Sequence, residues 1–236
     1  MSSPSRKPLL ISAGVAVAAI TLGVASWQAT APADKPSGGS AASPAPRTDP
    51  AAGLKALARR EAGDKLAVGS ADAPVVLIEY SDFKCGYCGK FARDTEPELI
   101  KRYVHDGTLR IEWRNFPIFG ADSEAAAKAA WAAGQQDRFR QFHEAAYADG
   151  AKEKGFGEAR LLELAQQAGV PDLERFKKDM AGEQAAAALQ KDQDEGYRIG
   201  VASTPSFLVN GRPIAGAQPI GAFTAAITQA RAAAGK

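Results

Sequence analysis

The stretch PVVLIEYSDFKCGYCGKF, residues 74–91, decides how this chain folds. Its first part, PVVLIEY (74–80), is a short apolar run rich in β-branched residues and bounded by Pro74 and a polar Ser-Asp pair, which is typical of a buried central strand. Both cysteines of the chain, Cys85 and Cys88, follow directly. They therefore lie where a buried strand passes into the next element.

The neighbouring segments continue the pattern of strands and helices. Upstream, the sequence predicts a short amphipathic helix at 54–61 and a weak strand at 65–69. Downstream, it predicts a helix over 89–107 with a kink at Pro97. The strand that follows, LRIEWRNFP (109–117), alternates apolar and charged residues, so one of its faces is expected to point toward the core.

The C-terminal half is mostly helical by its sequence. An Ala-rich block at about 121–199 carries helical patterns and no strand signal. A hairpin is then predicted around Asn210-Gly211, the strongest short turn dipeptide, followed by a last helix at about 221–234. This order predicts an α/β fold with a mixed sheet and an inserted helical domain.

Composition indicates an ordinary globular chain. The 236 residues are 45% hydrophobic and 24% charged, with 29 basic and 27 acidic residues. This near balance leaves a formal charge of +2 and no basic stripe with interleaved aromatic residues, so nucleic acid is not an expected partner.

The N-terminus carries a membrane signal. Arg6 and Lys7 precede an uncharged apolar run, residues 9–27. Residues 1–30 are interpreted as a retained anchor that crosses the cell membrane once, with the N-terminus in the cytoplasm and the rest of the chain exported. The alternative is a cleaved signal peptide, after which the protein would be secreted or periplasmic.

A flexible tether is predicted to follow the anchor. Residues 31–50 are a Pro/Ala/Ser/Gly mixture with almost no large apolar residue, and the folded domain is expected at 51–236. Both interpretations of the N-terminus place this domain outside the cytoplasm. Thiols can be oxidised there and disulfides persist.

The cysteine spacing suits a redox pair. In a first helical turn, Cys88 is at position i+3 from Cys85, so the two sulfurs can approach bonding distance. Unpaired N–H groups at a helix N-terminus favour the Cys85 thiolate. Cys85 is therefore predicted to be the attacking or attacked sulfur and Cys88 the resolving one, with no cofactor beyond their disulfide.

Two other uses of the cysteines remain open. A structural zinc needs four ligands, and the two histidines, His105 and His143, have no spacing typical of a zinc site, so no metal is expected. A purely structural disulfide is the second alternative, although it would close a very small loop and stabilise little.

The sequence resembles a known family. The pieces IEYSDFKCGYC (78–88), WRNFP (113–117), the Ala-rich block and STPSFLVNGRPIAG (203–216) are similar, in this order, to the DsbA-type disulfide oxidoreductases. They look most like the membrane-tethered or secreted DsbA-like proteins of Gram-positive bacteria. The resemblance implies a thioredoxin fold with a helical insertion at about 121–199.

The resemblance also implies residue roles. Cys85 matches the nucleophile and Cys88 the resolving cysteine of the family. Thr204 and Pro205 match a dipeptide with a cis bond that faces the disulfide and binds an extended substrate. Glu79 matches a buried acid that exchanges a proton with Cys88. The alternatives are an ordinary trans-proline loop and a Glu79 that faces solvent.

The chain departs from the family between its cysteines. It has Gly86-Tyr87 where the well-known Gram-negative oxidase has Pro-His, so no imidazolium can stabilise the Cys85 thiolate. The helix terminus and neighbouring N–H groups remain for that purpose. Phe83 and Tyr87, beside the cysteines, are interpreted as an apolar landing surface for unfolded polypeptide.

These observations predict an extracytoplasmic thiol:disulfide oxidoreductase that introduces disulfides into exported proteins. Its expected partners are reduced or unfolded polypeptides and, as the family implies, a quinone-linked membrane protein that re-oxidises it. A reductase or isomerase is the alternative within the class. An exported chaperone with a structural disulfide is the alternative outside it.

Overall fold

The computed structural model describes residues 50–235. The predicted anchor (1–30) and nearly all of the predicted tether (31–50) lie outside the described residues. None of the helices within 50–235 is long and apolar enough to cross a bilayer.

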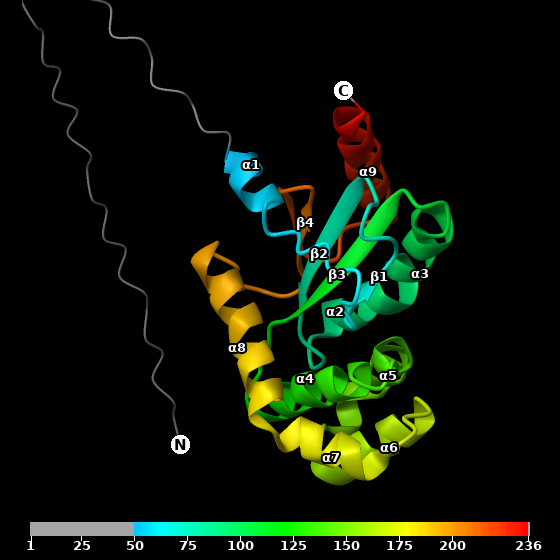
Figure 1. The fold of residues 1–236 in the computed structure, drawn as a ribbon, viewed down its shortest axis with the longest axis vertical. Helices are drawn as coiled ribbons and strands as arrows, with labels where there is room; N and C mark the ends of the chain where they lie inside the picture. The colour runs from blue at the N-terminus through cyan, green and yellow to red at the C-terminus, as the bar shows by residue number, and fades with distance from the viewer. Residues whose placement is uncertain (1–49, 236) are drawn as a thin grey trace, which may run out of the picture. The chain divides into compact units, whose positions relative to one another are not determined.

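The sheet has five strands in the order β1-β3-β2-β4-β5 (Figure 1). They span β1 Ala67–Val68, β2 Val75–Ser81, β3 Leu109–Asn115, β4 Ser206–Val209 and β5 Arg212–Ala215. β2 pairs in parallel with β3, and every other pairing is antiparallel. The mixed sheet is thus confirmed, and β2 lies at its centre as its apolar sequence predicts.

One long helical run follows the cysteines. It comprises α2 Gly86–Lys90, a π-helical stretch Phe91–Thr95, α3 Glu96–Leu99 and a second π-helical stretch Ile100–Val104. Pro97 lies in the first turn of α3, where a missing N–H group costs little. The irregularity predicted as a kink at Pro97 is therefore spread over two π-helical stretches that flank α3.

The helical insertion packs beside one end of the sheet (Figure 1). Its elements are α4 Ala121–Gly134, α5 Phe139–Ala146, a 3₁₀ turn Lys152–Lys154, α6 Glu158–Gln167, α7 Leu173–Ala181 and α8 Glu183–Arg198. The last helix, α9 Ile220–Ala234, packs on the sheet. The helical block, the hairpin with Asn210-Gly211 at its turn and the final helix match the predicted segments.

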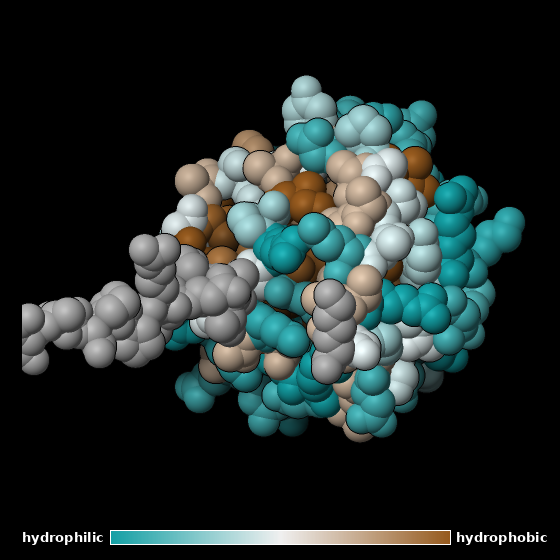
Figure 2. Space-filling view, turned by 90° about the horizontal axis from the view of Figure 1, so that it is seen from above, coloured by the Kyte–Doolittle hydropathy of each residue, from teal (hydrophilic) through white to brown (hydrophobic). Residues whose placement is uncertain are grey.

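Apolar residues form three buried clusters around the central strand. Alternate residues of β2 enter two of them: Val75 and Leu77 pack with α9 and Phe91, while Val76 and Ile78 pack on the other face with Phe116. The third cluster fills the helical insertion. On the face seen from above, Figure 2 shows hydrophobic residues in separate patches among hydrophilic ones.

The first helix differs from its prediction. It was expected at 54–61, whereas α1 spans Pro50–Lys55. The backbone N–H groups of Arg59 and Arg60 donate instead to the carboxylate of Glu112 on β3, at 3.0 and 2.8 Å. The backbone N–H groups of Arg59 and Arg60 therefore do not continue the helix. They bond to Glu112, because a buried carboxylate needs hydrogen-bond donors.

Gly196 of α8 allows a close approach of the helix to the sheet domain. A Cβ atom there would lie 2.6 Å from Cε2 of Phe116, whose ring is fully buried. We expect Gly196→Ala to destabilise the fold by about 1–3 kcal/mol through overpacking, although alanine is the better helix former. Denaturant unfolding measures this loss.

Gly221 of α9 provides the matched control. Nothing lies within 4 Å of the Cβ that Gly221→Ala would add, so that variant is expected to be neutral or slightly stabilising. Equal unfolding midpoints for the two variants would contradict the overpacking argument.

Candidate active site

The loop after β2 presents the cysteines, and Asp82 shapes it. The Asp82 side chain accepts hydrogen bonds from the N–H of Lys84 at 2.7 Å and, on its other oxygen, from Ile118 at 2.7 Å and Phe119 at 3.2 Å. Its carbonyl accepts the N–H of Cys85 at 3.0 Å. Sequence reasoning missed this residue; an Asp at a strand end, two residues before an unpaired N–H, is the signal of such a turn.

Cys85 is the N-cap residue of α2. Its sulfur accepts the backbone N–H of Cys88 at 3.4 Å, as a capping side chain does. Its Sγ also lies 3.2 Å from the carbonyl oxygen of Thr204, to which the thiol can donate. The sulfur is therefore fixed between a helix N-terminus and the strand connection that precedes β4.

The surroundings of Cys85 favour its thiolate. Hydrogen bonds from the Cys88 thiol and from the N–H groups of Cys88 and Tyr87 outweigh burial and lower the pKa of Cys85 to about 6. Cys85 is consequently ionised to a large extent at neutral pH without a histidine neighbour.

Cys88 has the opposite character. It is fully buried, and burial, followed by the neighbouring Cys85, raises the pKa of its thiol well above the ordinary value. Ser81 and Tyr147, whose hydroxyl oxygens are 3.3 Å apart, belong to its surroundings. The two sulfurs thus differ in charge preference as a nucleophile and a buried leaving group should.

Glu79 lies inside the sheet rather than at its solvent edge. It is fully buried on β2, opposite Trp113 of β3 and Phe207 of β4. Neither of its carboxyl oxygens has a hydrogen-bond partner among the described residues. Burial, and secondly the charge of Glu96, raise the pKa of Glu79 well above the usual range and so favour its protonated form.

The peptide bond between Thr204 and Pro205 is cis, and the Thr204 carbonyl faces Cys85. Tyr87 is 69% exposed beside the cysteines. Together, Cys85, Cys88, Thr204, Pro205 and Tyr87 come from two distant parts of the chain to one place.

The expectation for Phe83 is wrong. Its ring is buried and packs among the aromatic side chains of the helical insertion, with centroids 4.9 Å from Tyr147 and 5.4 Å from Trp113. It cannot offer a surface to a polypeptide. A second exposed aromatic residue is Phe119, which follows β3 and is 51% exposed. Its backbone N–H donates to Asp82 in the loop that carries the cysteines.

The comparisons with known proteins agree with this architecture. A family model described as thioredoxin matches residues 61–229, and the chain therefore belongs to the thioredoxin family. A probable disulfide bond formation protein D of Bacillus anthracis is 33% identical over 61% of this chain and 69% of its own length. Because this relative is more than 30% identical and covered over more than two thirds of its length, the chain belongs with the disulfide bond formation proteins of the thioredoxin family.

Solved structures show the same fold. Oxidised BdbD of Bacillus subtilis superposes with a TM-score of 0.66 at 24% identity, covering 71% of this chain and 92% of that one. A thioredoxin-like oxidoreductase of Silicibacter pomeroyi gives 0.63 at 27% identity, covering 72% and 97%.

In another group of relatives, only a part of a much longer protein matches this chain. A protein of Salinispora arenicola named Na(+)/H(+) antiporter NhaA 1 is 34% identical over 69% of this chain. The chain spans about a quarter of that relative, 24% of its length.

Proposed function

We propose that this protein introduces disulfide bonds into exported polypeptides through its Cys-Gly-Tyr-Cys pair, outside the cytoplasm and held at the membrane by its N-terminal segment. The observation that supports this best is the contrast between the two thiols. The pKa of Cys85, about 6, reflects a stabilised thiolate, and this thiolate stabilises the reduced form of the pair. A well-stabilised reduced form makes the corresponding disulfide a strong oxidant.

The first step is attack on the oxidised pair. A substrate thiolate bonds to Sγ of Cys85, and the Cys85–Cys88 bond breaks with its electron pair going to Cys88. Cys88 is buried, so its thiolate is unfavourable there and needs a proton. Glu79 supplies this proton, because its raised pKa keeps it protonated before the step.

The second step releases the product. A second substrate thiolate attacks the substrate sulfur of the mixed disulfide, and Cys85 leaves as the thiolate that its hydrogen bonds stabilise. The substrate loses two electrons and gains a disulfide, while the cysteine pair gains the two electrons. A quinone-linked membrane partner, the class of oxidant that the family implies, then accepts them and restores the Cys85–Cys88 bond.

Thr204, Pro205 and Tyr87 are the residues we assign to substrate binding. The Thr204 carbonyl is within 3.2 Å of Sγ of Cys85, so an extended chain that pairs with this backbone brings its own cysteine to the reactive sulfur. Tyr87, between the two cysteines in the sequence, offers an exposed ring. Binding through backbone groups suits an enzyme that acts on many sequences.

The test is the redox equilibrium of the full-length chain with graded glutathione ratios, read by thiol alkylation. We expect the pair to become reduced at more oxidising ratios than thioredoxin, whose potential is about −270 mV. A potential at or below that value would assign the protein as a reductase. A pair that never exchanges would identify a structural disulfide.

A further inference from the structure

A second buried carboxyl, Glu96, lies where the sheet domain meets the helical insertion. Its side chain is only 6% exposed, at the start of α3. One carboxyl oxygen is 3.0 Å from the guanidinium of Arg140 on α5. The other has no hydrogen-bond partner among the described residues and is 3.8 Å from Nδ1 of His143, too far for a hydrogen bond. Only one oxygen of Glu96 is therefore fixed.

His143 does not neutralise this carboxyl. Burial, and secondly the charge of Arg140, lower the pKa of His143 to about 3, so its ring is neutral at physiological pH. The ring packs against Trp113 and Tyr147, with centroids at 4.8 and 4.9 Å. Within residues 50–235, Arg140 is thus the cation that pairs with Glu96, and it also pairs with Glu144 at 2.9 Å.

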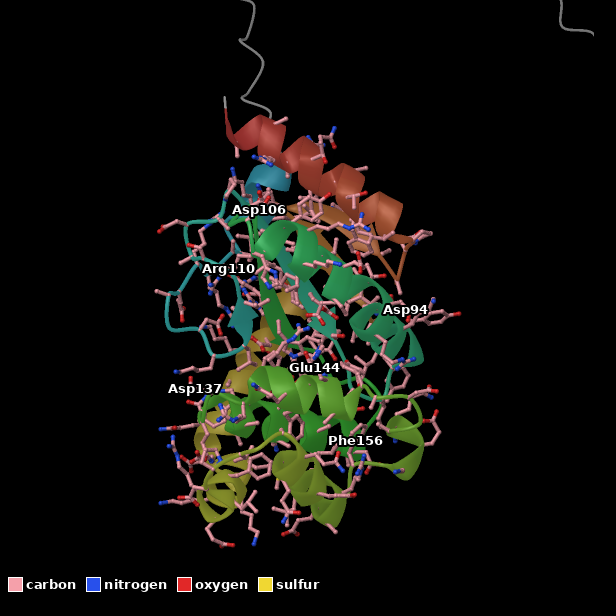
Figure 3. All side chains as sticks on the ribbon, turned by 90° about the vertical axis from the view of Figure 1, so that its right-hand side faces the viewer. Asp94, Asp106, Arg110, Asp137, Glu144 and Phe156 are labelled. Carbon is pink, nitrogen blue, oxygen red and sulfur yellow. The ribbon has the colours of Figure 1, made fainter. Side chains whose placement is uncertain are left out.

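Glu96 borders space that solvent can enter. A cavity of about 350 Å³ opens beside the short edge strand β1, and its lining includes Glu96 and Arg140 but not Glu79. Lys65 and Asp137, paired at 2.6 Å, lie at the same cavity. Figure 3 labels Glu144 at the junction of the two domains and Asp137 nearby on the side of β1.

Glu96 also acts on Glu79 across the interior. Glu79 is opposite Trp113 in the sheet, and the Trp113 ring packs against the His143 ring, which lies beside Glu96. The Glu96 charge raises the pKa of Glu79, whereas Arg140 lowers it. The titratable and charged groups around the two carboxyls are Cys85 and Cys88 at α2, together with Arg140, His143, Glu144 and Tyr147 of the α5 segment.

We propose that Glu96 is a positioning residue for the proton of Glu79: its negative charge, held by Arg140, keeps that proton in place until Cys88 leaves as a thiolate. This inference rests on the proposed role of Glu79 as the proton donor. When Glu79 gives its proton to Cys88, the interior holds two carboxylates that repel each other, and one proton taken up by Glu96 from the cavity removes the repulsion. Burial, opposed by Arg140, raises the pKa of Glu96 to about 7, which suits uptake near neutral pH.

The decisive variant is Glu96→Gln in the full-length reduced chain, with Glu79 followed by carboxyl ¹³C NMR during a pH titration. Removing the negative charge and leaving Arg140 in place should lower the titration midpoint of Glu79 by about one pH unit or more. Glu96→Asp keeps the negative charge, so the titration midpoint of Glu79 should stay close to its wild-type value. Glu98→Gln is the matched control, since Glu98 is on the same helix with its carboxylate exposed and paired to Arg102 at 3.1 Å.

The wild-type chain gives an independent measurement. Coupling predicts that the Glu79 signal shifts in two steps, one of them at the midpoint of Glu96. A single step in the wild type, or the same Glu79 midpoint in Glu96→Gln and Glu98→Gln, would overturn the inference and leave the role of Glu79 intact.

The role of Glu79 itself is tested by Glu79→Gln. The rate at which reduced glutathione opens the oxidised pair should fall by about 10²-fold near neutral pH, and its dependence on the Glu79 ionisation should disappear. An unchanged rate and pH profile would remove Glu79 as the proton donor, whatever the NMR titration of Glu96→Gln shows.

Discussion

Replacing Cys88 with serine is expected to trap the protein on a disulfide partner, whereas replacing Cys85 with serine removes exchange. In Cys88→Ser, the Cys85 thiolate still attacks oxidised glutathione, because the backbone N–H groups at positions 87 and 88 still donate hydrogen bonds to it. No internal thiol then releases the adduct. Mass spectrometry of the full-length chain should show one stable glutathione adduct per chain.

Cys85→Ser is the matched variant, with the other sulfur kept. Its remaining thiol, Cys88, is fully buried and has a raised pKa, so little thiolate is present and the glutathione disulfide cannot reach it. Adduct formation should be slower by at least about a hundredfold at pH 7, from the thiolate fraction alone. Adducts on Cys88 at a comparable rate would reverse the assigned roles.

The positions of the catalytic parts could be predicted because they are local features of the sequence. A buried apolar strand, a Cys-x-x-Cys after it and an Asn-Gly hairpin each depend on a few adjacent residues. The mixed sheet is predicted from the order of these segments around the strand of residues 75–81, whereas the order of the strands in the sheet is not predicted and comes from the structure.

Contacts between distant segments could not be predicted in the same way. Phe83 has an exposed neighbour, Tyr87, in the sequence, yet its ring is enclosed by side chains of the helical insertion. The role of Glu96 depends on Arg140, which lies across the domain junction and far along the chain. The burial of Phe83 and of Glu96 cannot be predicted from the residues next to the cysteines, because it depends on how the helical insertion packs against the sheet.

The charged face of β3 shows the same limit most clearly. Alternation in LRIEWRNFP predicts that its charged residues lie away from the core, yet all seven residues of β3 are buried. Glu112 accepts hydrogen bonds from Arg110 and Arg114, both at 2.9 Å, and from two backbone N–H groups. Arg114 continues to Glu195 of α8 at 2.9 Å. An ionic network joins the segment after α1, the sheet and α8.

We expect Glu112→Gln to destabilise the protein by about 3–5 kcal/mol, because it leaves buried guanidinium and N–H donors without their carboxylate. For a chain of this length, the melting temperature should fall by about 10 °C. Glu174→Gln removes a carboxylate from an exposed pair with Lys177 and should change stability by less than about 0.5 kcal/mol. Denaturant and thermal unfolding of the three proteins at pH 7 measure these differences.

The pH dependence of stability tests whether the loss in Glu112→Gln is due to the missing negative charge of Glu112. Burial disfavours the Glu112 carboxylate, but the N–H groups of Arg60 and Arg59 and the charge of Arg114 outweigh it, so the pKa of Glu112 lies below its usual value. A depressed pKa stabilises the fold above the unfolded value of about 4.3, and that stabilisation is lost as pH falls toward the folded value. The gap between wild type and Glu112→Gln should therefore shrink below about pH 4. A gap that stays constant down to pH 3 would mean that the shape of the side chain, and not its charge, holds the network together.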